Sequence, residues 1–79
     1  MEKIIEELVK NPWDFVVYKT NKGFVINVVF HASAIDYSRS FRLDEQKAYQ
    51  GIEGLKQLSQ SISENYNFYK DREIIIEVE

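Results

Sequence analysis

The fold is decided by two consecutive apolar stretches, Trp13-Asp-Phe-Val-Val-Tyr18 and Phe24-Val-Ile-Asn-Val-Val-Phe-His31. Both are rich in aromatic and β-branched residues, which are typical of strands. The sequence between them, residues 19–23 (Lys-Thr-Asn-Lys-Gly), ends in a glycine that can adopt positive φ. The pattern therefore predicts a β-hairpin over residues 13–31.

A third strand is predicted over residues 36–43. Tyr37, Arg39, Phe41 and Leu43 alternate there with Ser38, Ser40 and Arg42. Such alternation is typical of a strand with one face in water. In the hairpin strands, by contrast, both faces carry apolar residues. Either the chain's own N-terminal helix or C-terminal segment covers the second face, or that face is left for a partner; the first explanation is the stronger.

One helix is predicted before these strands in the sequence and one after them. Before the hairpin, Ile4, Ile5, Leu8 and Val9 recur at helical spacing, which predicts a short amphipathic helix that ends at Asn11-Pro12. After the third strand, Asp44 is a plausible N-cap for a long helix that runs to about Glu64. Gly51 and Gly54 lie inside this helix, and we attribute them to close packing against the sheet, with a kink as the alternative.

Residues 65–69 follow as an exit loop, and residues 73–79 as a last strand with Ile74, Ile76 and Val78 on one face. The expected fold class is α+β in the order α-β-β-β-α-β: an antiparallel meander of three or four strands, with one long helix packed across a face, as a single domain over residues 1–79. The pattern leaves three placements open for the last strand: in this sheet, against a second copy, or beside the first helix.

The composition of the 79 residues limits the function classes. Hydrophobic residues make up 44% and aromatic residues 14%, so large rings can fill one core, and the expected rings are Trp13, Phe15, Phe24, Phe30 and Phe41. The absence of cysteine excludes disulfides, thiolate nucleophiles and the usual structural zinc sites. The acidic start, net charge of -3 and lack of a long apolar run predict a small acidic cytoplasmic protein without a membrane segment.

Catalytic residues are scarce. His31 is the only histidine, and although it can pair with Asp36 across a turn, a lone polar histidine at a strand end is usually solvated or hydrogen bonded. The carboxylates are scattered rather than spaced as metal ligands, and Gly51-Ile-Glu-Gly54 does not form a phosphate loop. We therefore expect no enzymatic activity, no metal, no cofactor and no small-molecule ligand.

The order helix, three strands, helix resembles that of double-stranded RNA-binding domains, and Lys47-Ala48 stands near the start of the long helix. That family places several lysines there to grip phosphates, whereas this chain begins the helix with Asp44-Glu45. Arg39, Arg42 and Tyr37 offer a small basic patch on the third strand, but pairing of these arginines with Asp36 or Asp44 is the simpler expectation. Nucleic-acid binding is accordingly the alternative function.

The stretch from Asp36 to Glu45, with the helix carrying Gly51 and Gly54, resembles small bacterial immunity and accessory proteins, which bind a toxin or enzyme through an acidic α+β domain. This resemblance implies a non-catalytic protein-binding domain whose partner is another protein or a second copy. Aromatic residues and arginine dominate interface hot spots, although for each aromatic residue here the core is the stronger expectation. The predicted contact residues are Trp13, Tyr18, Tyr37, Arg39 and Arg42.

Overall fold

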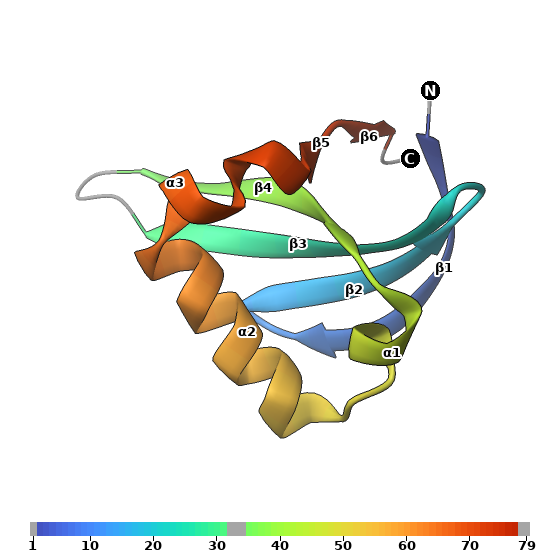
Figure 1. Cartoon of the computed structure of the whole chain (residues 1–79), viewed down its shortest axis with the longest axis horizontal. Coiled ribbons are helices and arrows are strands. Elements are labelled where there is room, and N and C mark those ends of the chain that lie inside the picture. Colours follow the sequence, from blue (N-terminus) through green and yellow to red (C-terminus); the bar gives the residue numbers. More distant parts are fainter. Residues whose placement is uncertain (1, 32–34, 78–79) are drawn as a thin grey trace.

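The computed structural model describes residues 2–31 and 35–77. Four strands run consecutively along the chain: β1 (Glu2–Asn11), β2 (Phe15–Thr20), β3 (Gly23–His31) and β4 (Asp36–Leu43). The helices α1 (Glu45–Ala48), α2 (Ile52–Glu64) and α3 (Tyr66–Tyr69) follow, then a 3-10 turn η1 (Lys70–Arg72). Two short strands, β5 (Glu73–Ile74) and β6 (Ile76–Glu77), complete the described chain. The fold is mixed α+β, as predicted (Figure 1).

The N-terminal segment is strand β1, and the prediction of a helix there is wrong. Its register with β2 shifts twice, between Ile4 and Glu6 and between Glu7 and Val9. Each such bulge adds a residue and resets the alternation of faces, so apolar residues recur at spacings that imitate a helix. Pairing with β2 also satisfies backbone groups at the edge of the hairpin, an effect that no local window of sequence contains. The order of elements therefore begins with a strand and not with α.

The meander itself is confirmed, because β1–β2, β2–β3 and β3–β4 all pair antiparallel. The last strand is divided between the two edges of this meander. β5 pairs antiparallel with β4 at Ser40 and Phe41, and β6 pairs parallel with Glu2 and Lys3 of β1. The sheet order is β5-β4-β3-β2-β1-β6, so one short C-terminal segment borders both edges (Figure 1). The last strand thus joins this sheet; Val78 and Glu79 lie outside the described residues.

The main core lies between the sheet and α2, which crosses one face of it as predicted (Figure 1). Its buried members are Phe15, Val17, Ile26, Val28, Phe30, Phe41, Leu43, Ala48, Leu55 and Ile62. Of the rings expected in the core, Phe24 is half-buried and packs against it. Trp13 is the exception, because it is 78% exposed and lies in the turn between β1 and β2.

The predicted long helix is interrupted between Ala48 and Ile52. Gly51 has φ of 93° and precedes the first residue of α2, in the left-handed region that favours glycine. The kink alternative is therefore correct for Gly51. At Gly54, a Cβ atom would meet only the flexible side chain of Gln50, so close packing against the sheet does not account for this glycine. The predicted exit loop contains the short helix α3.

The second face of the sheet is covered at one end by the chain itself. Val25 is completely buried there, and Glu2, Thr20 and Ser40 are nearly so. The sheet curls until the start of β1 reaches β4, where Glu2 accepts hydrogen bonds from Arg42. Of the two explanations for the apolar second face, coverage by the chain holds at this end, with a strand in place of the expected helix. Among the described helices, none has the length and apolar character to cross a membrane.

Candidate protein-binding surface

Trp13 lies at a strained position in the turn between β1 and β2. The Asp14 N–H donates to the carbonyl of Asn11 at 3.0 Å, which closes a β-turn with Pro12 and Trp13 at its centre. Trp13 has φ of 72° and is the one non-glycine residue with positive φ among the described residues. A turn with proline followed by positive φ corresponds to type II, in which glycine is preferred at the second central position. An L-residue there costs about 1–2 kcal/mol.

Neighbouring groups hold this turn in place. The Val29 N–H donates to the carbonyl of Asp14 at 2.9 Å. His31 Nε2 lies 3.0 Å from the carbonyl oxygen of Trp13, and its Nδ1 lies 3.2 Å from Asp36 Oδ1. The expected pairing of His31 with Asp36 is therefore present, and both ring nitrogens are engaged. His31 ties the Trp13 backbone to the β3–β4 end of the sheet while the indole stays in solvent.

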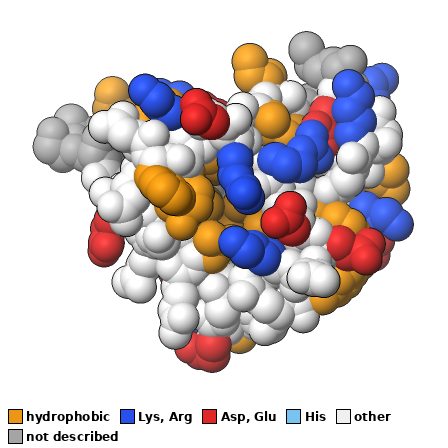
Figure 2. All heavy atoms as spheres, viewed as in Figure 1, with side chains coloured by type: hydrophobic (Ala, Val, Ile, Leu, Met, Phe, Trp, Pro, Cys, Tyr) orange, Lys and Arg blue, Asp and Glu red, His pale blue; other side chains and the backbone are white. Residues whose placement is uncertain are grey.

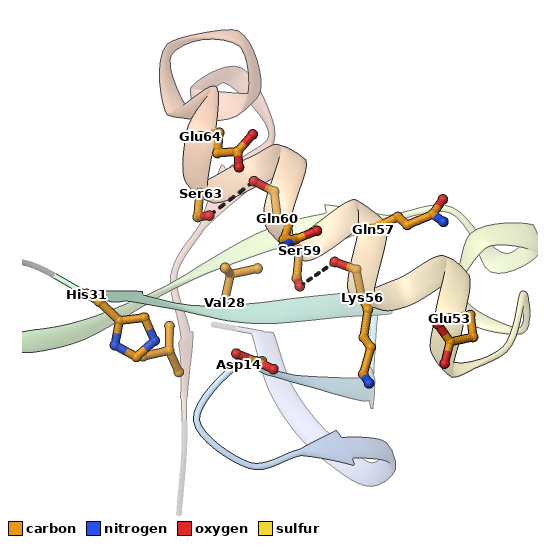
Figure 3. Close-up of a pocket in the computed structure, with 11 residues that line it drawn as sticks. Asp14, Val28, His31, Glu53, Lys56, Gln57, Ser59, Gln60, Ser63 and Glu64 are labelled. Carbon is orange, nitrogen blue, oxygen red and sulfur yellow. Dashed lines mark hydrogen bonds between the residues drawn. The ribbon is translucent and has the colours of Figure 1, made fainter.

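A groove of about 490 Å³ lies beside this turn, between α2 and the strands (Figure 3). Val28 and Val29 of β3 line its floor, of which Val28 is almost completely buried and Val29 half-buried, and Asp14 and His31 line the side of the Trp13 turn. The opposite wall is polar and comes from α2: Glu53, Lys56, Gln57, Ser59, Gln60, Ser63 and Glu64. Figure 3 shows Lys56 and Ser59 extending from α2 toward the strands. The volume is in the usual range for ligand sites in proteins.

Some polar groups of this groove already form hydrogen bonds within the protein, and others do not. Ser59 and Ser63 donate their hydroxyl hydrogens to carbonyls of α2 itself, at 2.9 and 3.1 Å (Figure 3). Within the described residues, Glu53, Glu64 and Lys56 form no ion pair. Asp14 accepts one hydrogen bond, from the Asn11 amide at 2.9 Å. Three carboxylates against one lysine leave the groove net negative.

Tyr37 and Arg39 are brought together on one side of β4, with two residues that the sequence analysis missed. The Arg39 guanidinium lies over both the Tyr37 and Tyr66 rings, 5.4 and 5.1 Å from their centroids. It also donates to Glu73 Oε2 at 2.8 Å, and Tyr66 donates its hydroxyl to Glu73 Oε1 at 2.6 Å. Tyr37 in turn stacks on Phe30 at 5.4 Å. This cluster attaches α3 and β5 to the edge of β4.

The electrostatics of this cluster follow from those contacts. Hydrogen bonds from Tyr66 and Arg39 stabilise the ionised Glu73 and lower its pKa, although partial burial opposes this. The same hydrogen bond to Glu73 raises the pKa of the Tyr66 hydroxyl. No local signal in the sequence pairs Arg39 with Glu73, because the two are far apart along the chain.

Arg42 points to the other side of β4 and forms a different ion pair. Its Nη1 donates to Glu2 Oε2 at 2.9 Å and its Nη2 to Glu2 Oε1, while Thr20 also donates to Glu2. Burial of the Glu2 carboxyl raises its pKa, but the hydrogen bonds from Arg42 and Thr20 outweigh burial and leave the pKa lowered. Arg42 therefore links β4 to the start of β1.

Tyr18, in β2, is half-buried. Burial, together with the neighbouring Glu7 carboxylate, raises the pKa of its hydroxyl. Because Tyr18 is half-buried, its ring is less available to a partner than that of Trp13. The predicted contact residues divide into exposed Trp13, the partly exposed pair Tyr37 and Arg39, and the more enclosed Tyr18 and Arg42.

The predicted basic patch on β4 is not assembled, since Arg39 and Arg42 lie on opposite sides of the strand and each has a carboxylate partner. Those partners are Glu73 and Glu2, not the expected Asp36 or Asp44. Figure 2 shows lysine and arginine side chains interleaved with acids on the face that includes α1 and η1. Lys47 and Arg72 border a dimple of only about 10 Å³ on this face, and Arg72 pairs with Asp44 at 4.0 Å.

Comparison of the chain with protein-family models, with curated proteins and with solved structures finds no match. Within the described residues, no group of three or more His, Cys, Asp or Glu side chains is placed to hold a metal ion.

Proposed function

We propose that this chain is a non-catalytic protein-binding domain, of the kind found in small bacterial inhibitor, immunity and accessory proteins, and that Trp13 is the centre of its interface. The observation that carries the proposal is the combination of an indole that is 78% exposed with a backbone φ of 72°. Glycine would relieve the strain, and solvent gives the indole no stabilising contact. A residue that costs stability in the free protein is expected to contribute elsewhere.

The physical properties of tryptophan fit a binding role. Its ring offers a large, rigid apolar surface with few rotatable bonds, which makes it frequent among interface hot spots. The contact between His31 and the Trp13 carbonyl fixes the turn before any partner arrives, so that little ordering remains to be done on binding. The engagement of both His31 nitrogens also supports a structural role for the only histidine of the chain.

Capture from a lysate of the source organism tests the proposal. The bait is the wild-type chain, compared with Trp13→Gly and with Ile5→Ala, which removes a different large apolar side chain that is 64% exposed on β1. We expect the same protein to be retained by the wild type and by Ile5→Ala and to be lost with Trp13→Gly. Retention of every captured protein by Trp13→Gly would refute the assignment of the interface to Trp13.

Light scattering across a range of concentrations decides whether the partner is a second copy. A dimer that dissociates when Trp13 is replaced by glycine would make this surface a homodimer interface. A mass that stays monomeric directs the search to a different protein. Titration with duplex RNA or DNA at low salt tests the alternative function, since nucleic-acid binding depends strongly on salt.

A further inference from the structure

From the groove between α2 and the Trp13 turn, we infer that the partner presents an arginine or lysine side chain, which enters this groove while the backbone around it packs against Trp13. This inference rests on the proposed protein-binding function and specifies the chemistry of the partner. The groove opens beside the turn that displays Trp13, since Asp14, the next residue, lines it (Figure 3). The turn that carries Trp13 therefore borders the groove through Asp14.

The negative charges of the groove favour a cationic side chain as its occupant. Glu53 and Glu64 lie toward opposite ends of α2, about 16 Å apart along its axis at about 1.5 Å per residue. Asp14 lies on the facing turn (Figure 3). Within the described residues neither glutamate has an ion-pair partner, so both retain their full capacity to accept hydrogen bonds. A guanidinium or ammonium group between α2 and the turn would be attracted by the carboxylates of both walls, whereas an anion would be repelled.

The remaining surfaces of the groove suit a long cationic side chain. The half-buried Val29 offers apolar contact to its methylene stem, and the Gln57 and Gln60 amides can accept further hydrogen bonds. Lys56 is the one lysine or arginine among the described residues that line the groove, and its flexible side chain can move aside. The chain itself is acidic, with a net charge of -3, so a basic partner is a better complement than a second copy.

The fluorescence of Trp13, the only tryptophan, provides a direct readout without a known partner. The probes are hexa-arginine, hexa-lysine and hexa-glutamate peptides, titrated into the chain at low and at physiological salt. We expect the two basic peptides to change the Trp13 emission with an affinity that falls as salt is added, and hexa-glutamate to have no effect. Shifts of the backbone amide signals of α2, Trp13 and Asp14 would place the peptide in the groove.

A matched pair of double variants separates the groove from the general acidity of the protein. Glu53→Gln with Glu64→Gln neutralises the groove, and Glu6→Gln with Glu45→Gln makes the same charge change at exposed positions outside it. The groove variant is expected to weaken hexa-arginine binding on the order of tenfold or more, and the control variant much less. Equal weakening by both variants, or no binding of basic peptides at low salt, would overturn the inference.

Capture of the natural partner by the same variants distinguishes a failure of the groove inference from a failure of the proposed function. If lysate capture depends on Trp13 but is unchanged by Glu53→Gln with Glu64→Gln, the cationic-groove inference fails and the proposed function stands. If capture does not depend on Trp13 while the groove variant still loses basic peptides, the groove binds cations without the proposed interface. A concentration-dependent mass that falls with either variant would identify the occupant as a second copy and contradict the assignment to a different basic partner.

Discussion

The backbone of Trp13 makes a quantitative prediction about stability, tested with two variants that differ only in one methyl group. Trp13→Gly and Trp13→Ala both remove the exposed indole, but only alanine keeps a Cβ atom at φ of 72°. The left-handed conformation costs an L-residue about 1–2 kcal/mol, and the greater freedom of glycine in the unfolded chain offsets about 0.4–1 kcal/mol of this. We therefore expect the glycine variant to be more stable than the alanine variant by about 1 kcal/mol.

The assay is urea unfolding followed by far-ultraviolet circular dichroism, because both variants lack tryptophan fluorescence. In thermal unfolding of a domain of this size, the same difference of about 1 kcal/mol would appear as a difference in melting temperature of about 4–8 °C. Relative to wild type, glycine should be neutral or stabilising, since the indole is 78% exposed and its loss removes little buried surface. Equal stability of the two variants would refute the claim of backbone strain. A glycine variant much less stable than wild type would show that the ring is structural, and the functional argument from strain would fail.

Three further predictions concern the framework of the domain. Arg42→Met leaves the buried Glu2 carboxylate without its main partner and should cost about 3 kcal/mol in urea unfolding, while Arg39→Met, at a more exposed pair, should cost less. In the folded protein the pKa of Glu2 is lowered from 4.5, so the ionised carboxylate stabilises the wild type above pH 4.5. This contribution to the free energy of unfolding should be lost as the pH falls through the folded pKa. Arg42→Met should abolish this pH dependence. Gly51→Ala, at φ of 93°, should lower the melting temperature. Gly54→Ala lies inside α2 and would meet only the flexible side chain of Gln50, so it should leave the melting temperature unchanged or raise it.

The central sheet could be predicted because its signals are local. The hairpin strands are rich in aromatic and β-branched residues, β4 shows alternation, and the structure confirms all three strands. The N-terminal strand could not be predicted in this way, because two bulges set its register and its pairing with β2 decides its conformation. Gly51 was recognised as unusual, but the sequence does not show that the chain turns there with positive φ.

Only part of the candidate site could be predicted from the sequence, because its residues come together through contacts between distant segments. Its residue type makes Trp13 a candidate contact residue, but the sequence pattern places it on a strand facing the core, and only the turn geometry shows it in solvent. Arg39 and Arg42 were grouped because they are close in sequence, whereas strand geometry sends them to opposite sides. The groove combines residues of β3, α2 and the first turn, and no spacing in the sequence connects Asp14 with Glu53 or Glu64.

The pairing of one C-terminal segment with both edges of the sheet has a consequence for how the chain folds. Glu2 is matched with Ile76, at nearly the other end of the described residues, so β1 cannot complete its pairing until that distant part of the chain has been synthesised. Closing so long a loop carries an entropic cost, and non-local pairings of this kind slow folding. The nascent chain would expose the open edge of β1 in the meantime, and the charged side chains at Lys3, Glu6 and Glu7 would then discourage pairing with neighbouring chains.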